Sequence, residues 1–199
     1  MAIEIHAFTT VIQKMSSSGE SFWMMVHADA AAHFPPEHSF RNRGCILVAL
    51  VLCRSSGFRL TFLYRFASCA RKYTWFGAVV SRLLFWFGRH WYGCSIASSA
   101  EIGGGLVLPH PQGIVIGGAA KIGSRCWIFQ NVTIGGAPGK DGHPTIGNDC
   151  RIYTGAVITG PIYVGSGVMV GANSVVHRDV SDKSLVRCSD ARIDILHVE

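Results

Sequence analysis

Branched apolar residues recur at every sixth position along most of the second half of the chain. A helix would repeat near 3.6 residues and a simple strand every second residue, so neither element explains this period. Hexapeptide repeats are the signature of a β-helix, in which three short strands form one triangular coil of about 18 residues with branched side chains pointing inwards. The series comprises Ile96, Ile102, Leu108, Ile116, Ile122, Ile128, Ile134, Ile146, Ile152, Ile158, Val164, Val170 and Val176.

Two further features accompany the repeat. A glycine follows many of the branched residues, and we interpret it as a turn residue that adopts positive φ. A small or branched residue also returns four places after many of them, at positions that include Cys126 and Cys150. These two cysteines are therefore predicted to pack inside the prism and to have no redox role.

The register of the repeat slips in two places, and each slip contains a histidine. Leu108 and Ile116 are eight residues apart, which inserts two residues beside His110. Ile134 and Ile146 are twelve apart, and the intervening "GGAPGKDGHPT" is predicted to project as a loop of about six extra residues that carries His143. With that loop set aside, positions 110, 130, 154 and 172 fall on one edge of the prism. That edge could accept an elongated ligand parallel to the axis.

The first half of the chain has a different character. Residues 41–90 contain nine arginines and lysines and no acidic residue, and aromatic residues are interleaved with them at roughly helical spacing. A packed helical region is the preferred reading, and a face that touches a membrane is the alternative. Nucleic-acid binding is not expected, because no recognisable motif accompanies the charge. The predicted division is an N-terminal helical region over 1–93, a β-helix over 94–181 and a tail over 182–199.

Composition indicates the cellular environment in which the protein is expected to work. The longest strongly apolar run, residues 44–53, is about half the length needed to span a bilayer, so no transmembrane helix is expected. The seven cysteines form no close pair and follow no cleavable signal sequence, which favours a reducing cytoplasm. Charged residues make up only 15% of the chain, which suggests surface hidden in an oligomer or against a membrane.

Three stretches carry a resemblance to a known family. The segments "PHPQG", "TIGGAPGKDGHPTIG" and "GANSVVHRDV" resemble the serine acetyltransferase branch of the hexapeptide-repeat acyltransferases, and "GFRLTFLYRFA" contains a Tyr-Arg pair often found there. The resemblance spans about residues 57–181. It implies a mainly β fold, a left-handed parallel β-helix preceded by α-helices. It also implies a homotrimer or dimer of trimers with active sites between subunits, and acetyl transfer from acetyl-CoA to a hydroxyl.

The same resemblance assigns roles to individual residues. His110 matches the catalytic histidine, and His143 matches the second active-site histidine. Gly136, Thr154 and Ala172 match positions whose backbone lines the CoA site. Lys140 is a further candidate partner for a CoA phosphate.

Histidine suits general-base work near neutral pH, so His110 is expected to take the proton of the attacking hydroxyl. His143 would then bind or polarise the acceptor or assist the tetrahedral intermediate, and a turn amide such as that of Gly136 would stabilise the oxyanion. No cysteine lies at either slip, which favours direct transfer over an acyl-enzyme.

Several positions depart from the family pattern. Ser95 stands where an acid orients the catalytic histidine, Pro109 and Gly142 replace charged residues beside the two histidines, and an acceptor-binding Asp falls near Asn42. Because a free amino acid needs charged partners, we expect the acceptor to be a sugar or glycan, with a peripheral contact at the inner membrane surface. Serine acetylation and a non-catalytic scaffold are the alternatives. No metal is expected, because the one close histidine pair, His33 and His38, lies in a proline-containing turn before the repeat.

Overall fold

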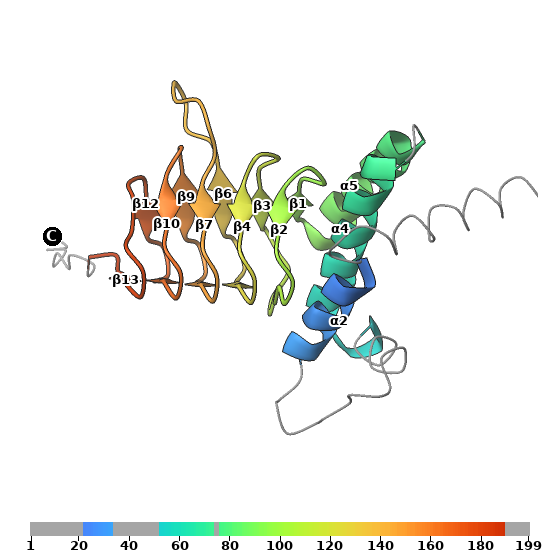
Figure 1. Ribbon diagram of the computed structural model, residues 1–199, viewed down its shortest axis with the longest axis horizontal. Coiled ribbons are helices and arrows are strands. Elements are labelled where there is room, and N and C mark those ends of the chain that lie inside the picture. Colours follow the sequence, from blue (N-terminus) through green and yellow to red (C-terminus); the bar gives the residue numbers. More distant parts are fainter. Residues whose placement is uncertain (1–21, 34–51, 74–75, 190–199) are drawn as a thin grey trace, which may run out of the picture.

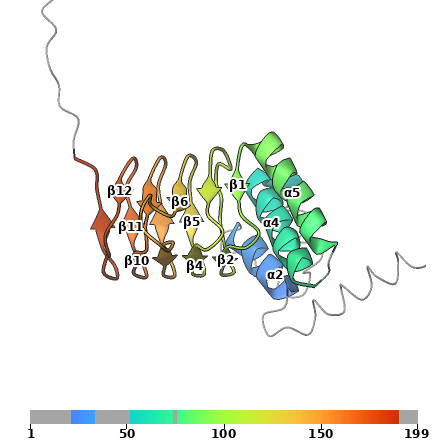
Figure 2. The ribbon, with the colours of Figure 1, turned by 90° about the horizontal axis from the view of Figure 1, so that it is seen from above.

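The computed structural model describes residues 22–33, 52–73 and 76–189 as a helical cap on one end of a β-prism (Figure 1). The described part of the cap contains the helices α2 (Phe22–Ala32), α4 (Ser56–Tyr73) and α5 (Gly77–Tyr92). Helices α4 and α5 lie side by side across the end of the prism where β1 begins (Figure 2). This arrangement confirms the predicted helical region within the described residues; residues 34–51, which include Asn42 and His38, lie outside them.

The prism consists of three parallel sheets, each made of very short strands. Their orders are β1-β3-β6-β9-β12, β10-β7-β4-β2 and β13-β11-β8-β5, hereafter faces A, B and C. The strands are β1 (Ser95–Ile96), β2 (Glu101–Ile102), β3 (Val115–Ile116), β4 (Lys121–Ile122), β5 (Trp127–Ile128), β6 (Thr133–Gly135), β7 (Thr145–Ile146), β8 (Arg151–Ile152), β9 (Val157–Thr159), β10 (Tyr163–Val164), β11 (Met169–Val170), β12 (Val175–Val176) and β13 (Leu185–Val186). Because β13 pairs with β11, the prism continues past residue 181, where the sequence predicted a tail.

The register of the strands confirms the hexapeptide interpretation. On face A, Ile96 pairs with Ile116, then Ile134, Ile158 and Val176 follow in neighbouring coils. Successive partners are 18 residues apart, except for one step of 20 at the His110 insertion and one of 24 at the His143 loop. The branched side chains form one buried column inside the prism, as the period predicted.

The role predicted for the repeating glycines was wrong. Positive φ occurs mostly elsewhere, at turn residues that include Asn131, Asn173 and Asp149. Four of the glycines that follow the branched residues, Gly103, Gly123, Gly147 and Gly165, are needed because neighbouring coils approach closely at the corner between faces B and C. A methyl group on Gly103 would lie 2.6 Å from Ser124 Oγ, and one on Gly147 would lie 2.6 Å from Ser166 Oγ.

Cys126 and Cys150 lie inside the prism, as predicted. Both are buried, and their thiols donate to backbone oxygens of the next coil, Gly147 O at 3.3 Å and Gly165 O at 3.1 Å. The interaction with the Cys150 side chain, together with burial, raises the pKa of the Cys126 thiol. Cys126 is therefore a poor nucleophile and serves as packing.

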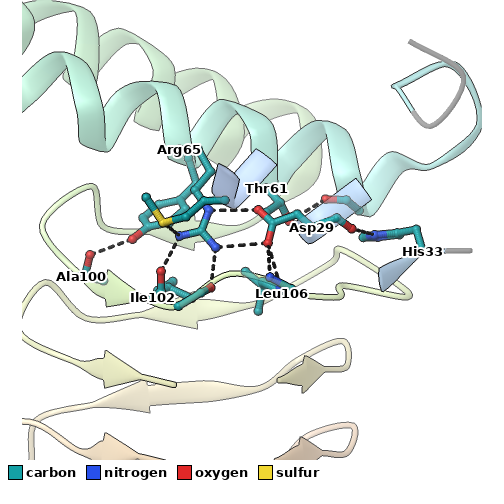
Figure 3. Close-up of polar contacts among 12 residues, drawn as sticks. Asp29, His33, Thr61, Arg65, Ala100, Ile102 and Leu106 are labelled. Carbon is teal, nitrogen blue, oxygen red and sulfur yellow. Dashed lines mark hydrogen bonds and ion pairs between the residues drawn. The ribbon is translucent and has the colours of Figure 1, made fainter. Parts of the chain in front are cut away.

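A buried ion pair fastens the helices to the first coil (Figure 3). Asp29 of α2 accepts hydrogen bonds from Arg65 Nε at 2.9 Å and from the backbone N–H groups of Gly105 and Leu106 at 2.7 and 2.8 Å. Arg65 of α4 in turn donates to the carbonyl oxygens of Ile102 and Gly103. One carboxylate and one guanidinium thus join two helices to the loop that follows β2.

Candidate functional site

His110 lies at the corner between faces C and A, where the two inserted residues widen the turn before β3. Its side chain is exposed, whereas the following Pro111 is buried and holds the turn against the prism. The Gln112 N–H donates to the His110 carbonyl oxygen at 2.8 Å, which tightens the turn. The imidazole ring lies 6.5 Å from the ring of Phe129, measured between centroids. The insertion therefore presents the histidine at the surface of the edge.

Positions 130, 154 and 172 follow His110 along the same edge, as the sequence predicted. Val107, Trp127, Arg151 and Met169 are in register, which stacks the residues three places after each of them. The Gly155 N–H donates to the Gln130 carbonyl oxygen at 3.0 Å, and the Asn173 N–H donates to the Thr154 carbonyl oxygen at 2.9 Å. Thr154 and Ala172 thus lie in neighbouring coils, and the edge runs parallel to the prism axis.

Sequence reasoning assigned no role to Gln130, which follows His110 along this edge. Its amide oxygen Oε1 is buried and has no hydrogen-bond partner among the residues that the structure describes. A buried acceptor of this kind costs free energy unless a donor reaches it. In the sequence, the feature that could have identified Gln130 was its place in the series 110, 130, 154 and 172. Next to it, the rings of Phe129 and Tyr153 stack at 5.1 Å and extend the apolar surface of the edge.

His143 lies at a different corner, between faces A and B, at the base of the loop that projects between β6 and β7 (Figure 1). Its ring packs on glycine backbone, because a methyl group on Gly117 would lie 2.9 Å from His143 Cδ2 and one on Gly136 would lie 3.6 Å from Cε1. Lys140 is exposed near the loop tip, where its N–H donates to the Ala137 carbonyl oxygen at 3.2 Å. The loop is a hairpin outside the hexapeptide register, as predicted.

Gly142 has a structural reason for departing from the family pattern. Its φ is +115°, a conformation that L side chains rarely adopt. A methyl group there would also lie 2.8 Å from Pro161 Cβ. A charged side chain at position 142 is therefore incompatible with this loop conformation.

One copy of the chain does not bring the two histidines together. His110, Thr154 and Ala172 share one edge of face A, whereas His143 and Gly136 share the opposite edge, and strand β3 crosses the face between them. Ser95, in β1, pairs with Val115, and its N–H donates to the Ile114 carbonyl oxygen at 2.8 Å. The candidate residues therefore form two half-sites.

A cleft of about 580 Å³ lies elsewhere, between α4 and the first coils. Tyr64, Arg71, Lys72, Ser99 and Lys121 are among the residues that line it, and neither candidate histidine does. Among the described residues, no group of three or more His, Cys, Asp and Glu gathers as metal ligands would.

Comparison with known proteins supports the resemblance seen in the sequence. Residues 143–178 match the family model "Bacterial transferase hexapeptide (six repeats)". The chain is 38% identical over 138 residues to a serine acetyltransferase of Bacillus subtilis, covering 68% of this chain and 63% of that protein. It is 35% identical over 144 residues to a serine acetyltransferase of Helicobacter pylori, covering 71% of this chain and 83% of that protein.

Solved structures extend the likeness to the helical cap. The crystal structure of Neisseria gonorrhoeae serine acetyltransferase in complex with serine matches with a TM-score of 0.75 at 29% sequence identity. The match covers 95% of this chain and 76% of that one. The chain spans less than two thirds of the length of the Bacillus subtilis relative. The chain belongs to the serine acetyltransferase family of left-handed β-helix proteins built from hexapeptide repeats.

Proposed function

We propose that the protein transfers the acetyl group of acetyl-CoA to the hydroxyl of serine. Family membership carries this proposal, because the Helicobacter pylori relative shares 35% identity across 83% of its own length. The Neisseria gonorrhoeae relative, which has the same cap and prism, is in complex with serine. The residues that match the catalytic and CoA-lining positions of the family lie on exposed edges, where such substrates can reach them.

The prediction of a sugar or glycan acceptor was wrong, because the relatives matched by sequence and by structure are serine acetyltransferases. That prediction assumed that each charged partner of serine must stand at the position where the family usually carries it. The loop before His143 instead supplies one charge of each sign, in the exposed residues Lys140 and Asp141. In our proposal these side chains contact the carboxylate and the ammonium of serine, and this role of Lys140 replaces the contact with a CoA phosphate that the sequence suggested.

The chemistry assigned to the residues is direct acyl transfer. His110 removes the proton of the serine hydroxyl while the oxygen attacks the thioester carbonyl carbon of acetyl-CoA. The tetrahedral intermediate collapses by breaking the C–S bond, and the CoA thiolate takes up the proton held by His110. In our proposal, His143 and the nearby backbone at Gly136 stabilise the oxyanion. The long edge formed by Thr154 and Ala172 would hold the extended arm of CoA.

The two half-sites require a second copy of the chain. In a cyclic trimer each copy presents one edge of its prism to the next, so the His110 edge of one copy can face the His143 edge of its neighbour. The exposed outward residues of the prism, which include Val175 and Tyr163, would gain from burial in such an assembly. We therefore propose a homotrimer with three equivalent active sites, each shared between two copies.

The purified protein should release CoA from acetyl-CoA in the presence of L-serine at least about tenfold faster than with neutral sugars. The reason is that charged groups around the site would be left unpaired by an uncharged acceptor. Liquid chromatography of acetyl-CoA and CoA is the suitable readout, because the seven cysteines of the protein interfere with thiol reagents. D-Serine is the matched control for acceptor geometry. If CoA were released at the same rate with L-serine, with each of the other acceptors and without any acceptor, the proposal would be contradicted.

Mixing two inactive variants should restore activity if the sites are shared. His110→Ala and His143→Ala trimers, unfolded together and refolded as a one-to-one mixture, should regain about a quarter of the wild-type rate, because each mixed trimer contains one site with both histidines intact. The rate is measured with L-serine and saturating acetyl-CoA. Refolding of each variant alone is the control. A mixture no more active than its components would place both histidines in one copy.

A further inference from the structure

The residues of helix α5 that are completely buried are all small. They are Gly77, Ser81 and Gly88, and Leu84 and Phe85 lie half-buried beside them against α4. Ser81 Oγ donates to Ser98 Oγ at 2.6 Å, and a methyl group on Gly88 would lie 3.5 Å from Leu60 Cδ1. These small residues let α5 approach the rest of the molecule closely. Its most exposed apolar residues lie on the opposite side.

The outward side of α5 carries a row of large, exposed apolar side chains. Trp91 is 73% exposed, Leu83 61% and Trp86 56%, and the outward side also includes Val79 and Phe87. They recur at spacings of three and four residues, so they form one stripe along a helix about 24 Å long. The rings of Phe87 and Trp91 stack at 5.4 Å and make the stripe continuous at its C-terminal end. We name these five residues the α5 stripe.

Positive charge borders the α5 stripe. Arg82 and Arg89 are exposed and lie seven residues apart, hence two turns apart on the same flank of the stripe. Arg71 and Lys72, in the last turn of α4, are exposed as well, but they line the cleft between α4 and the first coils. Residues 52–92 contain no aspartate or glutamate. The helix therefore combines an apolar side, two tryptophans and arginines at the boundary, which is the composition of helices that lie in a membrane interface.

We propose that α5 binds an anionic membrane surface through the α5 stripe. The stripe lies among the acyl chains, and Arg82 and Arg89 lie at the lipid phosphates. Charge distinguishes this occupant from a second copy of the chain. Two copies joined by their α5 stripes across a two-fold axis would bring the same basic flanks together with no acidic residue of this segment to pair them. Anionic lipid headgroups supply the missing negative charge. None of the described helices is long and apolar enough to cross a membrane.

Vesicle flotation with the full-length protein tests this proposal. Binding to phosphatidylcholine vesicles that contain roughly 30 mol% phosphatidylglycerol should be at least about tenfold stronger than binding to phosphatidylcholine alone, since each basic side chain near the surface adds to the attraction. The double variant Trp86→Ser/Trp91→Ser should lose at least about tenfold in affinity for the anionic vesicles. Arg82→Gln/Arg89→Gln should lose most of the preference for phosphatidylglycerol.

Trp23→Ser is the matched control, because it removes an exposed tryptophan from helix α2 and should leave vesicle binding unchanged. Quenching of tryptophan fluorescence by brominated lipid should be strong in the wild type and weak in Trp86→Ser/Trp91→Ser. Equal binding of the wild type and this double variant would overturn the proposal. The proposal would also be overturned if the variant had half the particle mass of the wild type in light scattering and bound vesicles equally well. That result would show that a second copy of the chain covers the α5 stripe. Acetylation of free serine should be the same in the variant, so this test is independent of the proposed function.

Discussion

Replacing His110 with alanine is expected to lower kcat for serine acetylation by at least about a hundredfold, the low end of what loss of a general base costs. The His110 side chain is exposed at a turn, and its ring contact is with the ring of Phe129. The affinity for CoA should change little, because the Thr154 and Ala172 edge remains intact. Steady-state rates give kcat, and isothermal titration with CoA gives the binding constant.

His177→Ala is the matched control for this variant. His177 is also an exposed histidine of the prism, next to the buried Val176 of β12, and it lies on the same edge as His143 but two coils beyond the coil of Gly135. Its removal should leave kcat within about twofold of the wild type, as for a surface substitution away from the reacting atoms. A near-wild-type kcat for His110→Ala would remove this histidine from the mechanism. A large loss in both variants would indicate a general defect in folding.

Replacing Asp29 with alanine is expected to lower the free energy of unfolding by about 3–5 kcal/mol, because it leaves the Arg65 guanidinium buried without its partner. Arg65 is only 4% exposed, and Asp29 is fully buried. The change also removes the acceptor of the Gly105 and Leu106 N–H groups. Urea unfolding followed by circular dichroism at 222 nm, at a fixed protein concentration, measures the effect on the helical cap.

Asp149→Ala removes the carboxylate of an ion pair of similar geometry at the surface. Arg125 Nε lies 2.6 Å from Asp149 Oδ1, and both side chains are more than half exposed. Exposed pairs contribute about 0–1 kcal/mol, so this variant should unfold close to the wild type. If the two variants lost equal stability, the buried pair would not be what fastens the cap to the prism.

Much of the prism could be predicted from the sequence. Each coil places its branched residues at fixed positions, and a parallel β-helix repeats the same contact in every coil, so a period of six is enough to place Ile116, Ile134 and Ile158 in one column. The two slips were also visible, because an insertion cannot enter the column and must leave the surface. The slips, together with the family resemblance, pointed to His110 and His143 as candidate site residues.

The acceptor and the turns were not predicted correctly, and both errors have a local cause. The absence of charged residues at three matched positions was read as the loss of serine binding, although charged groups can reach the acceptor from other positions. The turn glycines were assigned positive φ by residue type alone. The structure gives that conformation to residues such as Asn131 and Asp149, and Gly103 is instead required by the proximity of the next coil.

The sequence by itself determined the column of branched residues, the edge that follows His110 and the loop that carries His143, because these follow from spacing along one chain. Only the tertiary structure decided that Asp29 meets Arg65, that the two histidines stand on opposite edges of face A, and that α5 turns its tryptophans outwards. The physical reason is that these three features depend on how distant segments pack. Asp29 lies 36 residues from Arg65 along the chain. The direction in which a helix faces is set by which side can approach its neighbours most closely, and on α5 that is the side of Gly77, Ser81 and Gly88.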